Sequence, residues 1–263
     1  MTPRRTRSTA TAILTVATAS FLLPGCATHD TRVLTVHAAA SLSAVMNELA
    51  SEFEAEHPGT EIRVNTGGST GLATQIIDGA PGDVYASADL AQMARVTDEG
   101  IAPEPRAFAS NTLTIAVEPG NPANIGGLDA LTDPDLDVVV CAQPVPCGEA
   151  TARVEATSGI ELMPVSEELS VTDVLAKVTS GQADAGLVYV TDVAASGGTA
   201  TEVPLSNNTA TSESDLAEAA QTVYAIATLT TSSEPELATQ FVAYALSDPG
   251  QALMTQAGFG AAP

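Results

Sequence analysis

Ser41 is the first residue of the chain whose type and position could serve to bind an ion. It follows the small residues Ala38, Ala39 and Ala40, between a short hydrophobic strand expected at 33–36 and an amphipathic helix expected from Leu42 to His57. Ser41 therefore occupies the expected N-cap position. A helix N-terminus exposes unpaired N–H groups and a partial positive charge, so the turn predicts an anion site. A serine that only caps the helix is the plainer alternative.

A second turn of the same kind contains Ser69. A strand expected at 61–65 runs into Thr66-Gly67-Gly68-Ser69-Thr70-Gly71, and a helical pattern through Leu72 and Ile76 follows. In a parallel α/β sheet, two such turns lie together at the carboxyl ends of neighbouring strands, where open sheets bind ligands. No lysine follows the glycines, so the turn lacks the signature of a nucleotide-binding phosphate loop.

Cys141 and Cys147 are the two cysteines that lie well inside the chain. They are separated by the turn-like residues Ala142-Gln143-Pro144-Val145-Pro146. In an exported protein, a disulfide between them is the default expectation. A metal site is the alternative, but His29, His37 and His57 are all distant from the pair in sequence.

The N-terminus predicts export. Residues 1–25 begin with Arg4, Arg5 and Arg7 and continue with a mainly apolar, small-residue run over 9–23, which is too short for a permanent membrane span. The sequence Leu23-Pro24-Gly25-Cys26 resembles a bacterial lipoprotein signal, in which the cysteine becomes the lipid-modified first residue. We therefore expect residues 26–32 to tether the protein to the outer face of the cytoplasmic membrane. An ordinary cleaved signal with an incidental cysteine is the alternative.

The chain after Cys26 is strongly acidic. It carries six basic and 32 acidic residues, a formal charge of −26, and the acidic residues are dispersed rather than clustered in a tail. Such a surface repels nucleic acid and anionic lipid, which excludes nucleic-acid partners. It also repels an anionic ligand at long range, so an anion site here must rely on close-range donors shielded from water.

Strands and helices alternate through the rest of the chain, which predicts an α/β fold. Further strands are expected at 83–87, 111–117, 136–141, 185–190 and 223–227. Further helices are expected at 90–100, 149–158 and 171–180. Near the end of the chain one helix is expected to begin at Pro235, and a last short helix is expected to end near residue 258. The strand at 111–117 ends at the break Glu118–Pro122, where a crossing between two halves of the protein is expected. The strand at 223–227 predicts the return crossing.

Five segments together resemble the molybdate-binding lipoproteins of ABC importers. They occur in the family's order: Ala38–Leu42, Gly68–Ala73, Gly79–Asp89, Val145–Gly148 and Ala185–Tyr189. The resemblance covers nearly the whole mature chain. It implies a two-lobed periplasmic-binding-protein fold of type II, with two crossing strands and closure of the lobes over one tetrahedral oxyanion. The expected lobes are 33–111 with 226–263, and 112–225.

The resemblance also implies the residues that bind the ion. Ser41 and Ser69 would each offer a hydroxyl and a backbone N–H, Cys147 and Val171 backbone N–H groups, and Tyr189 its phenolic O–H. Molybdate at neutral pH carries no proton and only accepts hydrogen bonds, which suits a set made of donors alone. A site for hydrogen phosphate should include a carboxylate to accept the ligand's proton, and none of the five residues is one.

The implied function is capture of molybdate, and of tungstate, for delivery to a membrane permease driven by a cytoplasmic ATPase. We expect a monomer without enzymatic activity or cofactor. A binding protein for sulfate, thiosulfate or phosphate is the first alternative. A secreted serine hydrolase using Ser41 or Ser69 is the second, although no Gly-x-Ser-x-Gly elbow surrounds either serine. A structural surface lipoprotein is the third.

Overall fold

The computed structural model describes residues 31–206 and 211–263. The predicted signal peptide and the lipidation site Cys26 lie outside the described residues, as does most of the predicted tether. Among the residues described, no helix is long and apolar enough to cross a membrane.

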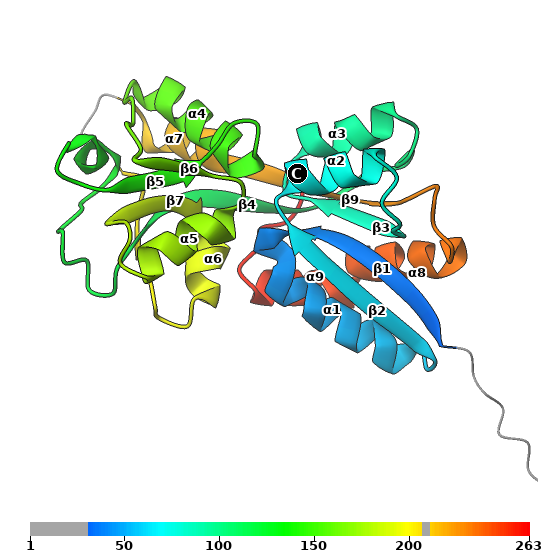
Figure 1. Ribbon diagram of the computed structural model, residues 1–263. Coiled ribbons are helices and arrows are strands. Elements are labelled where there is room, and N and C mark those ends of the chain that lie inside the picture. The colour runs from blue at the N-terminus through cyan, green and yellow to red at the C-terminus, as the bar shows by residue number, and fades with distance from the viewer. Residues whose placement is uncertain (1–30, 207–210) are drawn as a thin grey trace, which may run out of the picture. The chain divides into compact units, whose positions relative to one another are not determined.

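The first lobe, lobe I, begins with three parallel strands, each followed by a helix (Figure 1). The elements are β1 (Arg32–Ala39), α1 (Ser43–Glu56), β2 (Thr60–Gly67), α2 (Ser69–Ile77), β3 (Val84–Ser87) and α3 (Leu90–Asp98). Strand β1 pairs in parallel with both β2 and β3, and Ala39 lies opposite Gly67. The turns that follow β1 and β2 therefore emerge side by side, as the sequence predicts.

Two long strands pass between the lobes. β4 (Arg106–Val117) pairs with β9 (Gln221–Thr228) over its first half and with β7 (Ala185–Tyr189) over its second half, from Leu113 onward. The hydrogen-bonded order is β2-β1-β3-β9-β4-β7-β5-β6, with the short β8 (Thr201–Val203) also on β4. The crossing takes place within β4, because Phe108 and Ala109 belong to the core of one lobe and the residues from Leu113 onward to the core of the other, with the polar segment 110–112 between them. The exact lobe limits stay a prediction.

The second lobe, lobe II, contains the remaining strands and four helices (Figure 1). Its strands, besides β7 and β8, are β5 (Val138–Cys141) and β6 (Ser166–Glu168), and its helices are α4 (Pro146–Ser158), α5 (Val171–Thr179), α6 (Val190–Ala195) and α7 (Glu213–Ala220), with a 3-10 turn, η2 (Leu128–Thr132). The chain then returns through β9 to lobe I. There α8 (Pro235–Leu246) and α9 (Asp248–Gln256) pack beside α1, and Phe53 meets Phe241 edge-on.

Separate hydrophobic clusters stabilise the two lobes. One cluster joins buried residues between Leu113 and Ala220, and the largest cluster of lobe I joins residues between Leu34 and Ala109 with others between Tyr224 and Phe259. Burial of apolar surface is the main favourable term in folding. Each lobe therefore has a core of its own.

The structure corrects four local predictions. Ser41 is not an N-cap: it lies inside a 3-10 turn, η1 (Ala40–Leu42), and the residue before α1 is Leu42. The helix expected from Glu149 begins at Pro146, because proline fits the first helical turn, where its missing N–H costs nothing. Val190 starts α6 instead of ending β7. The strand expected from Asn111 already begins at Arg106.

Candidate functional site

The five predicted binding residues line one small cavity. Its volume is about 10 Å³, measured as the space open to the centre of a water-sized sphere. Ser41 and Ser69 come from lobe I, whereas Cys147, Val171 and Tyr189 come from lobe II. The other described residues that line the cavity are Ala39, Ala40, Gly68, Ala88, Val145, Pro146 and Ser170. Every described residue of this lining is uncharged, so neither a carboxylate nor an ammonium group is part of it.

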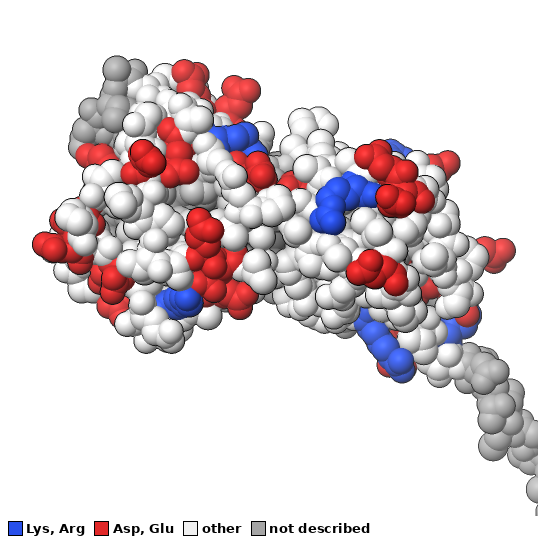
Figure 2. All heavy atoms as spheres, turned by 45° about the horizontal axis from the view of Figure 1, so that its top comes forward, with Lys and Arg blue, Asp and Glu red and all other residues white. Residues whose placement is uncertain are grey.

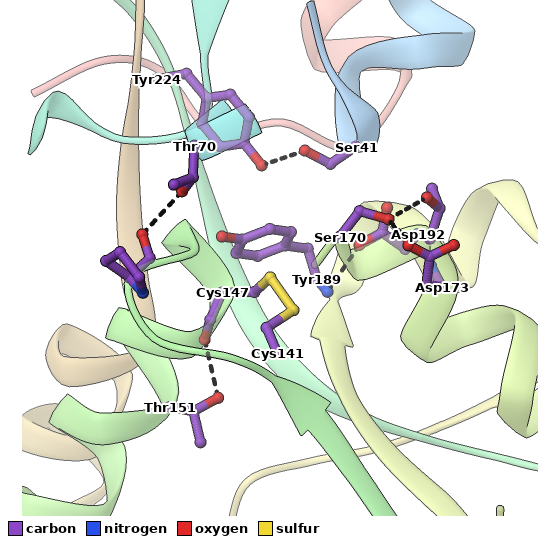
Figure 3. Close-up of a disulfide and its surroundings, with 12 residues drawn as sticks. Ser41, Thr70, Cys141, Cys147, Thr151, Ser170, Asp173, Tyr189, Asp192 and Tyr224 are labelled. Atoms are coloured by element: carbon purple, nitrogen blue, oxygen red, sulfur yellow. Dashed lines mark hydrogen bonds between the residues drawn. A yellow bond between two sulfur atoms is a disulfide. The ribbon is translucent and has the colours of Figure 1, made fainter. Parts of the chain in front are cut away.

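Ser41 is held by an aromatic residue from a crossing strand. Its Oγ lies 2.8 Å from the hydroxyl oxygen of Tyr224, which is on β9 (Figure 3). The turn η1 places Ser41 just after the end of β1, where Ser41 is part of the cavity lining.

Ser69 is the first residue of α2 and is buried. Its Oγ accepts a hydrogen bond from the backbone N–H of Ala88 at 3.0 Å, and its carbonyl accepts one from the Tyr85 hydroxyl at 2.9 Å. Because the Oγ already accepts from Ala88, the hydroxyl hydrogen of Ser69 is left to donate into the cavity.

Cys147 lies in the first turn of α4. The N–H groups of a first helical turn have no partner within the helix, so they are available to an anion. A disulfide joins Cys147 to Cys141 at the end of β5, with an S–S distance of 2.03 Å (Figure 3). The bond holds the helix start against the strand that precedes it.

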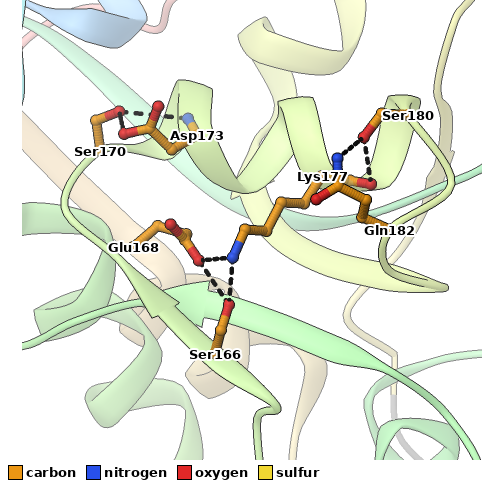
Figure 4. Close-up of polar contacts among 7 residues, drawn as sticks. All are labelled: Ser166, Glu168, Ser170, Asp173, Lys177, Ser180 and Gln182. Atoms are coloured by element: carbon orange, nitrogen blue, oxygen red, sulfur yellow. Dashed lines mark hydrogen bonds and ion pairs between the residues drawn. The ribbon is translucent and has the colours of Figure 1, made fainter.

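Val171 is the first residue of α5, and a polar cluster fixes this helix start (Figure 4). Ser170 Oγ donates to Asp173 Oδ2 at 2.7 Å and accepts from the backbone N–H of Asp173. Lys177, further along α5, donates to Ser166 Oγ at 2.7 Å and forms an ion pair with Glu168 on β6. These contacts hold the backbone N–H of Val171 at the cavity wall.

Tyr189 presents a buried hydroxyl that has no hydrogen-bond partner among the described residues. The side chain is 1 % exposed, and its ring points into the space bounded by Tyr224 and Cys147 (Figure 3). A buried polar atom without a partner is rare because it loses its bonds to water without replacement. Burial raises the pKa of this hydroxyl well above its usual value, so the group keeps its proton and can donate.

Asp192 lies behind Tyr189 and is also buried. Its Oδ2 accepts a hydrogen bond from the backbone N–H of Tyr189 at 2.9 Å, which fixes the end of β7. Burial raises the pKa of the Asp192 carboxyl to about 7, although the hydrogen bond from Tyr189 opposes this rise. The carboxyl is not among the residues of the cavity lining.

The arrangement can bind a small anion that carries no proton. Hydroxyl and backbone donors from both lobes converge on it, and each such bond to a charged acceptor is stronger than a neutral one. Elsewhere on the surface, acidic side chains are scattered over the visible face and basic ones are few (Figure 2). A water-shielded cavity with oriented dipoles therefore suits this protein better than an open basic patch.

Several residues that shape the cavity were not predicted from the sequence. Tyr224 contacts Ser41, and the Pro144 carbonyl accepts hydrogen bonds from Thr70 Oγ1 at 2.9 Å and from Gln92 Nε2 at 2.8 Å, which join the lobes. The signal available in the sequence is that Asn111 and Tyr224 bring polar groups into the predicted crossing strands, but other polar residues of these strands do the same. Their partners are too far away in sequence to be inferred from spacing.

Two lobes, two crossing strands and a cavity of donors between the lobes define a solute-binding protein with the type II periplasmic-binding-protein fold. The family model for bacterial extracellular solute-binding proteins matches residues 34–260. The chain belongs to this family.

Individual relatives agree with this assignment. The chain is 46 % identical over 239 residues to the molybdate-binding protein ModA of Mycobacterium tuberculosis, covering 90 % of this chain and 87 % of that one. Among solved structures, the periplasmic molybdate-binding protein of Azotobacter vinelandii superposes with a TM-score of 0.71 at 22 % identity. The superposition covers 86 % of this chain and 98 % of that one. The sulfate-binding protein SubI of Mycobacterium tuberculosis superposes with a TM-score of 0.74 at 18 % identity, and the superposition covers 87 % of this chain and 86 % of that one. The two structures share the fold with this chain.

Proposed function

We propose that this protein captures molybdate, and also tungstate, between its two lobes outside the cytoplasm and delivers the ion to an ABC transporter. The ion lies among the hydroxyls of Ser41, Ser69 and Tyr189 and the N–H groups at the starts of α4 and α5. No cofactor takes part, and the protein acts by binding, not by catalysis.

The observation that carries this proposal is the unpartnered hydroxyl of Tyr189. A folded protein leaves a buried donor without an acceptor at a cost of about 1–3 kcal/mol, and a bound oxyanion supplies that acceptor. The ligand must be an anion that only accepts hydrogen bonds, because the described lining offers donors and no carboxylate. The identity of 46 % to a molybdate-binding protein, over most of both chains, supports molybdate as that anion.

Sulfate is the second candidate because it is also a dianion without a proton at neutral pH. The same donors suit both ions, so cavity size separates them. Thiosulfate meets the same chemical requirement. Hydrogen phosphate is disfavoured because its proton finds no carboxylate acceptor in the described lining.

Calorimetric titration of the purified protein with molybdate, tungstate, sulfate and hydrogen phosphate tests the proposal. We expect molybdate and tungstate to bind at least about a hundredfold more tightly than sulfate, a difference near 2.7 kcal/mol. Tighter binding of sulfate than of molybdate would overturn the choice of ligand. Failure of all four ions to bind, or to raise the melting temperature, would favour a structural surface lipoprotein instead.

A serine hydrolase is disfavoured by the partners of its two candidate nucleophiles. Ser41 contacts the Tyr224 hydroxyl and Ser69 contacts a backbone N–H, and neither partner is a base. The histidine nearest in sequence, His37, has its ring nitrogens within hydrogen-bonding distance of the Pro81 carbonyl and the Asn65 amide. Ser41→Ala should weaken anion binding, whereas in a hydrolase it would abolish activity outright.

The membrane arrangement is part of the proposal. A lipid on Cys26 anchors a monomer to the outer face of the cytoplasmic membrane, where the closed form meets the permease and its ATPase. Cys26→Ser should release the protein into the culture medium or the soluble fraction while leaving molybdate affinity unchanged. Retention of this variant in the membrane would contradict the anchor.

A further inference from the structure

A buried polar network connects the two crossing strands to Ser41. Asn111 lies on β4 and Tyr224 on β9, with 3 % and 0 % of their surfaces exposed. Neither residue is among those that line the cavity. A buried polar network costs free energy unless every donor and acceptor in it has a partner, so the direction of each hydrogen bond can be inferred from the groups available.

The side-chain amide of Asn111 has a defined orientation. Its Oδ1 accepts from the backbone N–H of Thr112 at 3.0 Å, so the other end must be the NH₂ group. That group donates to Thr191 Oγ1 at 2.7 Å and to the Tyr224 hydroxyl at 3.3 Å. The Tyr224 oxygen is therefore an acceptor from Asn111.

The hydrogen bond from Asn111 bears on the direction at Ser41. Ser41 Oγ and the Tyr224 hydroxyl oxygen lie 2.8 Å apart, and either could be the donor. The Tyr224 oxygen already accepts from Asn111, and among the described residues its hydrogen has no acceptor other than Ser41 Oγ, so donation from Tyr224 to Ser41 is the arrangement that leaves no buried hydrogen unpaired. Burial raises the pKa of Tyr224 above its usual value, so this hydrogen is retained. With its oxygen accepting from Tyr224, Ser41 directs its hydrogen into the cavity. In the opposite arrangement Ser41 would donate to Tyr224 and turn its lone pairs toward the anion.

The Ser69 hydroxyl is oriented in the same way, by a hydrogen bond from a different donor. The backbone N–H of Ala88 occupies an acceptor position of Ser69 Oγ, which leaves the hydroxyl hydrogen for the ligand. Both serines of lobe I are thus set as donors by protein groups behind them. The difference is that a backbone group sets Ser69, whereas two side chains of the crossing strands set Ser41.

We propose that Asn111 and Tyr224 are positioning residues that orient the Ser41 hydroxyl as a donor and thereby make the cavity select oxyanions that carry no proton. This inference rests on the proposed function, since it deepens the account of the same site. The network also reaches lobe II, because Asn111 donates to Thr191, two residues after Tyr189. One amide therefore links the Ser41 side of the cavity to its Tyr189 side.

A double-mutant cycle of Tyr224→Phe and Ser41→Ala tests the inference. Tyr224→Phe keeps the ring that packs edge-on against Phe108 and Phe259, and removes only the hydroxyl. We expect it to lower molybdate affinity about tenfold by calorimetry. In the Ser41→Ala background it should have almost no effect, because Tyr224 acts through Ser41. Additive effects would overturn the inference.

The ratio of molybdate to hydrogen phosphate affinity is the second measurement. Tyr224→Phe should lower this ratio, because an unrestrained Ser41 can turn its oxygen toward a ligand proton. Tyr244→Phe, the same substitution on α8 at a partly exposed position, is the matched control and should leave both affinities unchanged. An unchanged ratio in Tyr224→Phe would count against the inference. Should that variant not fold, Asn111→Ala takes its place in the cycle.

The wild-type titration separates failure of the inference from failure of the proposed function. If the wild type binds molybdate and the cycle is additive, only the inference is wrong. If the wild type prefers sulfate, the proposed ligand is wrong, and the same cycle is run with sulfate. Binding of none of the tested oxyanions overturns both.

Discussion

Tyr189 has a buried hydroxyl that keeps its proton and has no partner among the described residues. Its hydrogen is therefore available to a bound anion. The lack of a protein partner predicts that removal of the hydroxyl should affect anion affinity and not stability.

Tyr189→Phe should leave the ligand-free protein about as stable as the wild type, because the Tyr189 hydroxyl makes no hydrogen bond to another described residue. Molybdate affinity should fall by about 10- to 100-fold, since a hydrogen bond to a charged group is lost. Thermal unfolding without ligand and calorimetric titration provide the two measurements. Equal molybdate affinity in the variant and the wild type would exclude Tyr189 from the binding site.

Asp192 predicts a dependence of stability on pH. Burial raises the pKa of its carboxyl to about 7, above the unfolded value near 3.8, so the folded state binds the proton more tightly. This contribution to stability is fully present below about pH 4 and is lost as the pH rises through 7.

Asp192→Asn should therefore raise the melting temperature by about 5 °C at pH 8 and leave it nearly unchanged at pH 4. The amide oxygen can still accept from the Tyr189 N–H, so the local backbone is retained. Thermal unfolding of both proteins from pH 4 to pH 8 measures the difference. A difference in melting temperature that does not grow with pH would show that Asp192 does not titrate in this range.

At the scale of elements, the segment from Cys141 to Cys147 has three roles. Its disulfide ties the start of α4 to the end of β5, its Pro144 carbonyl accepts hydrogen bonds from lobe I, and its last residue, Cys147, lies in the cavity lining. The position of this loop therefore affects both stability and binding.

Replacing both Cys141 and Cys147 by alanine should lower the free energy of unfolding by about 2 kcal/mol, as expected for a short cross-linked loop. Molybdate affinity should fall as well, because the Cys147 N–H and the Pro144 carbonyl lose their fixed positions. Denaturant unfolding and calorimetry measure the two effects. A thiol reductant should reproduce them in the wild type and have no effect on the double variant, and sensitivity of that variant to reductant would contradict this explanation.

At the scale of the whole molecule, ligand capture depends on close contact between the lobes. Thr70 and Gln92 of lobe I both donate to Pro144 of lobe II, and Gly68 lies against the Leu169 carbonyl. A Cβ atom at position 68 would lie 2.2 Å from that carbonyl oxygen, so the backbone on one side of this contact between the lobes would have to move.

Gly68→Ala should lower molybdate affinity at least about tenfold without lowering the melting temperature of the ligand-free protein. The backbone at Gly68, with φ −61° and ψ 132°, suits any residue, so the effect comes from space alone. Gly71→Ala is the matched control, because a Cβ there meets nothing within 4 Å. Equal affinities of the two variants, measured by calorimetry, would contradict closure at this contact.

Patterns in the sequence predicted the alternation of strands and helices and the two crossings, and the resemblance to the family identified the five residues that line the cavity. Hydrophobic periodicity and turn residues are local, so they could be read without a structure. The family's segments then placed all five predicted residues, although the helix starts at Ser69 and Pro146 were each missed by a few residues. Helix boundaries depend on competition between capping, proline and packing, which no single position reveals.

Only the tertiary structure decided how the Ser41 hydroxyl is directed. Its sequence position suggested a helix cap, but its partner is Tyr224, 183 residues further along the chain. The contact of Gly68 with Leu169 and the burial of the Tyr189 hydroxyl are decided in the same way. Sequence patterns report which face of an element is apolar, whereas the direction of a hydrogen bond depends on groups that folding brings together from distant elements.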